Sequence, residues 1–244
     1  MKHAILSDIH ANLQALQRVL EDAARLPLEH FLVCGDVVGY GAQPNECCAL
    51  IRALNAVVVR GNHDEAAVRV GKEEWFTASA RACILWTRDT LEEEHLEFLR
   101  ELGPSHQLPG AHVCHGSLPN PDLYTTTPLE ALQSLQVMEE QCCFLGHTHA
   151  AEWYTYRNDN RPPSQHPRPE GGEFELAEGR MYVINPGAVG QPRDGNSQAS
   201  YAVWDDEART IQIRRVSYDV AEAQRLILAA GLPPSMAERL RYGI

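Results

Sequence analysis

The sequence predicts an α/β fold, to which the C-terminal part adds a second, more antiparallel β-sheet. In the first part of the 244-residue chain, short apolar runs typical of β-strands alternate with helix-like stretches. From residue 152 onward, strand-like segments follow one another across turns. One domain spanning residues 1–244 is expected, since α/β and β-rich chains of this length can form a single unit.

Each of the β-type runs in the first pattern ends in a polar turn that in most cases contains glycine. The runs are HAIL, HFLVC, AVVV, AHVC, CCFL and MYVI. Between them, helices are expected at 12–25, 44–54, 66–88 with a break near Gly71, and 91–102. In an open α/β sheet the carboxyl ends of the strands lie along one edge. The turn residues are therefore expected to meet in one crevice.

The C-terminal part is expected to consist of strands followed by two helices. The strands are predicted at 152–156, 173–176, 181–184, 200–204 and 210–216, and the helices at 220–230 and 234–242. Residues 157–172, RNDNRPPSQHPRPEGG, are rich in proline, glycine and charge, which predicts a long loop between two strands.

Composition and charge exclude several classes of protein. The net charge of -12 disfavours a protein that grips a long nucleic acid, because that function requires a basic surface. No apolar stretch approaches the roughly 18–20 residues of a membrane span, and the N-terminal apolar run is too short for a signal peptide. A cytoplasmic protein without a membrane partner is expected. The seven cysteines, including the adjacent pairs Cys47-Cys48 and Cys142-Cys143, are typical of reduced core thiols.

Potential metal ligands occupy the turns after the β-type runs. They are Asp8, His10, Asp36, Asn62, His63, His115, His147 and His149. Alone, Asp8 and His10 are more typical of a helix cap and a surface histidine, and Asp36 of ordinary turn chemistry. These plain interpretations do not explain the ordered set. Oxygen and imidazole donors together suit Mn, Fe, Zn, Ni or Co better than a calcium site or a thiolate-rich zinc site.

The ordered series D-x-H, G-D, G-N-H-D, H-G and G-H-T-H resembles the signature of the calcineurin-like metallophosphoesterase superfamily. The stretches GDVVGYGAQPNEC and NPGAVGQPRDG more narrowly resemble its small bacterial and archaeal phosphodiesterase-type members. The resemblance extends from Ile5 to about Tyr201. It implies a four-layer αββα sandwich, in which two β-sheets pack together and helices flank them.

The resemblance also implies two divalent metal ions, manganese being favoured over Fe, Zn, Ni, Co or Mg. One ion would be held by Asp8, His10 and His149, and the other by Asn62, His115 and His147. Asp36 would bridge the two ions. A hydroxide between them would attack a small phosphodiester or phosphomonoester in line.

Four further residues are candidates for roles around the metals. His63 lies beside the substrate in the family and is expected to protonate the leaving alkoxide as a general acid. Asp64 either orients the His63 ring or caps a helix. Asn12 could bind a phosphate oxygen or act as an N-cap, and the first role is preferred. Arg193 could clamp the substrate or be a solvated turn residue, and the second is preferred.

Departures from the wider family limit the substrate prediction. Gly39-Tyr40 stands where protein serine/threonine phosphatases of the superfamily carry Asp-Arg, so a phosphoprotein phosphatase is disfavoured. Ala188 stands where related members often have serine. This difference leaves the metal ligands intact, but it makes the substrates of relatives a weaker guide to the substrate of this protein.

Two alternatives to an ester hydrolase stay open. One is a non-catalytic metal-binding interaction module, and the other is a hydrolase of nucleotide or dinucleotide phosphoanhydrides. Homo-oligomers are possible with any of these functions.

The tryptophans are expected in the core or in interfaces, and a base-stacking platform is disfavoured. They are Trp75, Trp86, Trp153 and Trp204.

Overall fold

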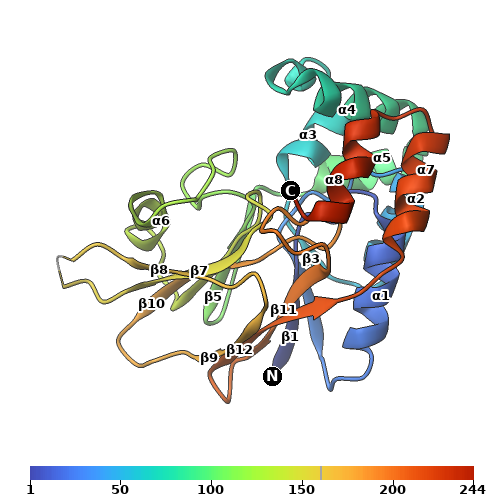
Figure 1. The fold of residues 1–244 in the computed structure, drawn as a ribbon. Coiled ribbons are helices and arrows are strands. Elements are labelled where there is room, and N and C mark those ends of the chain that lie inside the picture. Colours follow the sequence, from blue (N-terminus) through green and yellow to red (C-terminus); the bar gives the residue numbers. More distant parts are fainter. Residues whose placement is uncertain (160) are drawn as a thin grey trace.

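Two mixed β-sheets of six strands each pack face to face in the computed structural model, which describes residues 1–159 and 161–244 (Figure 1). Sheet A consists, in spatial order, of β3 (Val57–Val58), β2 (His30–Val33), β1 (Lys2–Leu6), β11 (Ala199–Asp205), β12 (Thr210–Val216) and β9 (Gly172–Glu175). Sheet B consists of β4 (Ser105–Leu108), β5 (Ala111–Cys114), β6 (Cys142–Phe144), β10 (Met181–Pro186), β7 (Ala151–Tyr156) and β8 (Ser164–Pro167).

Each sheet contains a block of three parallel strands. In sheet A the block is β1, β2 and β3, and in sheet B it is β5, β6 and β10. The other pairs are antiparallel, including β1 with β11, where Ile5 lies opposite Ala202. The expectation that the sheets divide near residue 152 was therefore wrong. Local apolar runs identify strands, but they do not encode which distant strand becomes the neighbour.

Helices cover the outer faces of both sheets, as the four-layer prediction required. Helices α1 (Leu13–Ala23), α2 (Pro44–Ala53) and α5 (Glu93–Glu101) pack on sheet A, and α6 (Pro128–Leu135) packs on sheet B. Helix α4 (Ala78–Thr90) packs with the C-terminal helices α7 (Val220–Ala229) and α8 (Pro234–Tyr242). Figure 1 shows α1, α2 and α7 together on one side of the sheets and α6 on the other.

Strand β1 shows how one apolar run contributes to two layers. Ala4 and Leu6 face the helices and pack in the same cluster as Leu16. Ile5 points the other way and packs between the sheets with Phe144. Because side chains alternate along a strand, a central strand that is buried on both faces needs an uninterrupted apolar run.

Phe144→Ala is expected to lower the free energy of unfolding by about 3–5 kcal/mol. Phe144 is fully buried between the sheets, and its ring centroid lies 5.3 Å from that of Trp204. Urea denaturation would measure the change. Leu129→Ala is the control, because Leu129 is 74% exposed and its loss should change stability by no more than about 0.5 kcal/mol. Equal effects of the two substitutions would contradict the packing between the sheets.

Residues 157–172 contain more regular structure than the expected loop. Strand β8 lies within this range and pairs with β7, with Trp153 opposite His166. Strand β9 begins at Gly172, and residue 160 lies outside the described part of the chain. Strand β8 is an edge strand of sheet B, a position that tolerates proline, and its composition therefore resembles that of a loop.

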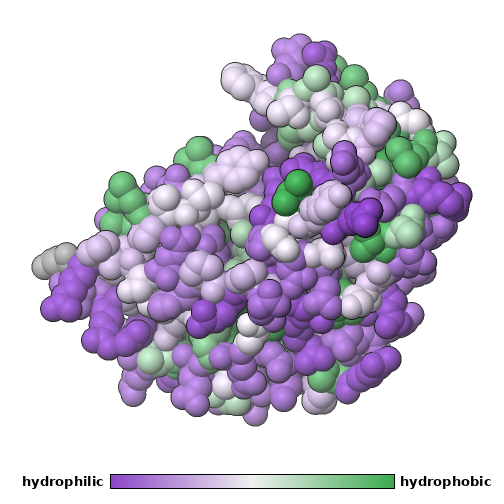
Figure 2. All heavy atoms as spheres, viewed as in Figure 1, coloured by the Kyte–Doolittle hydropathy of each residue, from purple (hydrophilic) through white to green (hydrophobic). Residues whose placement is uncertain are grey.

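The cysteines agree with the sequence analysis, but Trp75, which was expected in the core or in an interface, is 89% exposed. All seven cysteines are free and buried. Among the described residues, no helix has the length and apolar character needed to cross a membrane. Figure 2 shows a face that is mainly hydrophilic, on which hydrophobic residues lie in small, separate groups.

Candidate metal centre

The potential ligands meet at the carboxyl ends of the parallel strands. Asp8 and His10 follow β1, Asp36 follows β2, and the other donors lie on Asn62, His115, His147 and His149. Asn62 is the first residue of helix α3 (Asn62–Val68), which begins four residues earlier than the predicted helix. His115 follows β5, and both His147 and His149 follow β6. Sheet A and sheet B thus both contribute side chains to one crevice.

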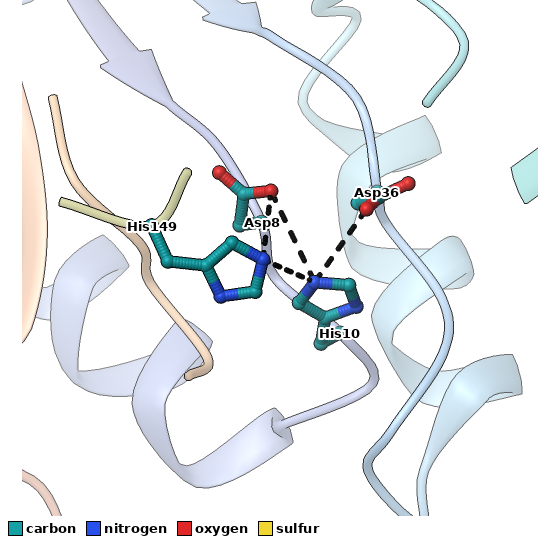
Figure 3. Close-up of side chains that lie close together, drawn as sticks. All are labelled: Asp8, His10, Asp36 and His149. Atoms are coloured by element: carbon teal, nitrogen blue, oxygen red, sulfur yellow. Dashed lines mark hydrogen bonds and ion pairs between the residues drawn. The ribbon is translucent and has the colours of Figure 1, made fainter. Parts of the chain in front are cut away.

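Two groups of donor atoms share the carboxylate of Asp36. The potential ligand atoms of the first group lie within 4.8 Å of one another, as do those of the second. The first group is Asp8, His10, Asp36 and His149, and the second is Asp36, His115 and His147. Figure 3 shows the first group, whose side chains point toward a common centre. Asn62 adds an oxygen to the second group, since its Oδ1 lies 3.0 Å from His115 Nε2.

Backbone carbonyls orient three of the imidazole rings. His10 Nδ1 lies 3.1 Å from the Val38 carbonyl, and His115 Nδ1 lies 2.7 Å from the Cys34 carbonyl. His149 Nδ1 lies 2.6 Å from the carbonyl of Gln191. A carbonyl oxygen only accepts hydrogen bonds, so each Nδ1 carries a proton, and in the neutral ring Nε2 then presents a lone pair. This arrangement is typical of histidines that bind metals.

Several buried polar atoms at the centre need a cation as a partner. The Nε2 atoms of His10 and His149 lie 3.1 Å apart, although neither carries a proton once Nδ1 is the donor. Asp36 Oδ2 and His147 Nε2 are buried without a hydrogen-bond partner among the described residues. Leaving such an atom unpaired costs about 1–3 kcal/mol. The residues therefore fit divalent cations bound by carboxylate and imidazole donors.

The turns that present the donors have an unusual backbone. Asp8, His10, Asp36, His147 and His149 all have left-handed φ angles, between 49° and 68°. For a non-glycine residue this conformation costs roughly 1–2 kcal/mol. Strain of this kind is retained where the surroundings enforce it, and it clusters at functional sites.

Burial and close charges shift the pKa values of the donors. Burial, together with the nearby Asp36 carboxylate, raises the pKa of Asp8 to about 7. Burial opposes protonation of His115, but the carboxylate of Asp36, 3.3 Å from its Nε2, raises its pKa to about 10. Burial lowers the pKa of His147 to about 3. A concentration of shifted pKa values in one cleft is characteristic of functional sites.

The His63 ring lies beside the donor groups. Its backbone N–H donates to Asp36 Oδ1 over 2.9 Å. The ring lies 4.4 Å from the Tyr40 ring and 4.8 Å from the Phe76 ring, measured between centroids. Its Nδ1 has no hydrogen-bond partner among the described residues, and burial lowers the pKa of the ring to about 4.

Asp64 contacts the backbone instead of the His63 ring. Its Oδ1 accepts from the Val38 N–H over 3.1 Å, and its Oδ2 accepts from the Gly61 N–H over 3.0 Å. These bonds tie the start of α3 to the turn that follows β2. The geometry favours the capping interpretation of Asp64 over the catalytic one.

Asn12 also acts within the fold. Its Oδ1 accepts from the Ala15 N–H over 3.1 Å, and its Nδ2 donates to the Gly190 carbonyl over 2.8 Å. Both polar atoms of the side chain are thus engaged, and Asn12 caps α1. The geometry therefore favours the N-cap interpretation over the preferred role in binding phosphate.

Arg193 lies at the cleft and not on a solvated turn. Its Nη2 donates to Tyr40 Oη over 3.2 Å and to Gln191 Oε1 over 3.1 Å. Its Nε is buried without a hydrogen-bond partner among the described residues. The position of Arg193 at the cleft thus differs from the solvated turn that the sequence analysis preferred.

A cleft of about 520 Å³ opens over the two donor groups. Its lining includes Asp36, Asn62, His63, His147, His149 and Arg193, together with the aromatic residues Tyr40, Trp75, Phe76 and Tyr124. Sequence reasoning did not assign these aromatic residues to the site. Tyr40 gave a signal, because it replaces the arginine of the phosphatase motif. Trp75 and Tyr124 gave none, since their place at the cleft depends on tertiary packing.

Residues 1–209 match the family model of the calcineurin-like phosphoesterase superfamily domain. The chain belongs to this superfamily. A metallophosphoesterase from Sphaerobacter thermophilus is 38% identical, covers 100% of both chains and superposes with a TM-score of 0.87. An uncharacterized protein from Methanocaldococcus jannaschii is 35% identical over an alignment that covers 98% of this chain and 97% of that protein. A hypothetical protein from Pyrococcus horikoshii OT3 shares the fold with a TM-score of 0.81. It is 20% identical, and the superposition covers 100% of this chain and 98% of that protein's chain.

Membership of the metallophosphoesterase family confirms the resemblance drawn from the motifs. The chain is accordingly an enzyme of the metallophosphoesterase and phosphodiesterase class. The buried Asp/His groups are consistent with the divalent metals that this family binds. The non-catalytic interaction module is correspondingly disfavoured.

Proposed function

We propose that the protein hydrolyses small phosphodiesters or phosphomonoesters by using two divalent cations, with manganese the favoured metal. The observation that carries this proposal is the pair of buried donor groups that share Asp36 beneath the cleft. Asp8, His10 and His149 would hold one ion, Asn62, His115 and His147 the other, and Asp36 both. When bound, two such ions would lower the pKa of bound water toward ~7 and offset the charge of the phosphoryl oxygens.

Arg193 is proposed to bind the phosphoryl group. Its guanidinium lies at the cleft and is positioned by Tyr40 and Gln191. The planar guanidinium donates several N–H groups in a fixed geometry that matches phosphate oxygens. The buried Nε has no hydrogen-bond partner among the described residues, which leaves one donor of the guanidinium unpaired in the free protein.

His63 is proposed to donate a proton to the leaving group. The ring is held against Tyr40 and Phe76 at the wall of the cleft. Burial lowers its pKa in the free protein, but an anionic phosphate beside the ring favours the protonated form. The negative charge of the bound substrate would thus favour the protonated His63 ring, which is the form that acts as a general acid.

The charge of the protein supports a small substrate. With a net charge of -12, the chain would repel a long polyanion, whereas two cations in the cleft would attract a compact phosphate ester. The cytoplasmic location and the possible homo-oligomer stay predictions from the sequence.

The deciding experiment is hydrolysis of bis(p-nitrophenyl) phosphate and of p-nitrophenyl phosphate by chelator-stripped protein that has been reconstituted with Mn, Fe, Zn, Ni, Co or Mg. Activity is expected only after reconstitution. His149→Ala should lower the activity by more than the roughly 10- to 100-fold typical of substitutions at residues that only hydrogen-bond to a metal ligand. The ratio of diester to monoester turnover would narrow the substrate class. Two bound ions without turnover for any metal would favour the interaction module.

A further inference from the structure

Two exposed aromatic side chains stand at the cleft but are not used by the proposed chemistry. Trp75 is 89% exposed and ends the short 3-10 helix η1 (Lys72–Trp75), between α3 and α4. Tyr124 is 50% exposed and lies in the segment that leads to α6. In Figure 1, α4 and α6 lie on opposite sides of the upper part of the molecule. The cleft lining includes both aromatic residues.

The segment that carries Trp75 is anchored to the fold. The guanidinium of Arg88 donates to the carbonyls of Ala66 and Ala67 over 2.5 Å and 3.2 Å. It also pairs with Glu73, a buried residue of η1, at 2.9 Å. Glu73 in turn accepts from the Gly71 N–H over 2.8 Å. The exposure of the indole is therefore built into a fixed element.

An exposed tryptophan lacks the hydrophobic stabilisation that its burial in the core would provide. Aromatic side chains bury about 150–250 Å² each when they pack, and a buried tryptophan is the more usual outcome. Trp153 and Trp204, by contrast, pack between the sheets. A ligand that covers Trp75 would supply the burial that the fold does not.

Tyr124 is fixed beside the metal centre by a ring contact. Its centroid lies 3.9 Å from that of His147, and the two rings are nearly parallel, at 19°. This contact occupies one face of the tyrosine ring while the residue stays half exposed. The aromatic lining thus extends from a proposed ligand of the second ion to the mouth of the cleft.

The cleft is larger than a phosphate group requires. Sites for small organic molecules typically measure about 300–1,000 Å³ and are lined by aromatic side chains with a few polar groups. At about 520 Å³ the cleft is of this size, and Lys72 and Asp122 supply polar groups near the aromatic residues. Aromatic side chains bind nucleobases by stacking, and this binding depends little on which base is present.

We infer that Trp75 and Tyr124 form a stacking subsite for a flat aromatic group, such as a nucleobase, attached to the phosphate that the metal centre binds. The inference rests on the proposed function, because that function places the phosphate over Asp36. It differs from the sequence-based expectation for Trp75, which disfavoured a stacking platform. The substrate class that follows is a mononucleotide or a small nucleoside phosphodiester.

The test compares two ligands that differ only in the base. They are the phosphonate analogues of adenosine 5′-monophosphate and of ribose 5-phosphate, whose C–P bonds resist hydrolysis. Their dissociation constants are measured by calorimetry on manganese-loaded protein. The adenine is expected to tighten binding about 10- to 100-fold. Trp75→Ala should remove most of this preference while changing the affinity for the ribose analogue by no more than about twofold.

Three variants make the result specific to the ring. Trp75→Phe should keep part of the preference for adenine, because a smaller ring still stacks. Tyr124→Phe should keep all of it, because only the hydroxyl is lost. Val70→Ala is the matched control, since Val70 is 84% exposed on the same segment but lies outside the cleft lining. It should leave both affinities unchanged.

Failure of the subsite and failure of the proposed function give different results. Equal binding of the two analogues refutes the subsite, whether or not bis(p-nitrophenyl) phosphate is hydrolysed. Base-dependent binding that is lost in Trp75→Ala supports the subsite even if no ester is hydrolysed, and the absence of turnover then refutes only the phosphoesterase proposal. Equal binding together with a changed oligomeric state of Trp75→Ala would instead assign the indole to a contact between copies.

Discussion

Asp36→Asn is expected to reduce the divalent ions bound per chain from two to at most one and to abolish phosphoester hydrolysis. Asp36 is the residue common to both donor groups, and its Oδ2 has no hydrogen-bond partner among the described residues. Asparagine is nearly isosteric and keeps an oxygen that can accept from the His63 N–H. The substitution removes the negative charge and one of the two oxygen donors. The loss of metal affinity and activity should therefore exceed the roughly 10- to 100-fold typical of substitutions at residues that only hydrogen-bond to a metal ligand.

Equilibrium dialysis with manganese, followed by metal analysis, would measure this result. Asp219→Asn is the matched control, because Asp219 caps α7 through its side chain and asparagine caps helices equally well. The control should bind two ions and stay active. Retention of two ions by Asp36→Asn would contradict the bridging position.

His63→Ala is expected to slow the hydrolysis of esters with alkoxide leaving groups by about 10²- to 10⁴-fold. A nitrophenolate leaves without protonation, so p-nitrophenyl esters should lose much less activity. The ring is buried and contacts Tyr40 and Phe76, and the backbone N–H that binds Asp36 is unchanged by the substitution. The metal content should therefore stay at the wild-type value.

The leaving-group dependence is measured by comparing kcat/KM for an alkyl phosphate, phenyl phosphate and p-nitrophenyl phosphate in the wild type and the variant. His106→Ala controls for the loss of an imidazole, because His106 is an exposed residue of β4. If His63→Ala lowers all three values equally, His63 has a role in binding or packing and is not the general acid.

The strands and the ligand turns could be predicted because their signals are local. The apolar runs that end at Leu6 and Val33 are strands, and the polar turns after them present Asp8 and Asp36. The pairing of β1 with β11 could not be predicted, since residues as distant as Ile5 and Ala202 are joined by tertiary packing. Strands β4 and β8 were missed because each has only four residues and lies at an edge of sheet B. Helix α6 was missed although Thr127 and Glu130 form a capping box at its start.

The roles of the polar residues around the metals depend on hydrogen bonds that no motif reveals. Asp64 and Asn12 both lie near the ligands in the sequence, but their oxygens accept from backbone N–H groups. Arg193 looked like a turn residue, and the contact of its guanidinium with Tyr40 becomes visible only in the fold. Trp75 gave no signal because solvent exposure is a property of the folded chain.

The donors of the metal centre come from turns that follow strands of both sheets, as in the pairing of Asp36 after β2 with His115 after β5. Ions at this position would cross-link the two halves of the sandwich and would bind only the folded chain. By mass action, a ligand at 100 times its dissociation constant adds about 2.7 kcal/mol to stability. Metal supply would thus set the resistance of the chain to proteases, and its lifetime, as well as its activity.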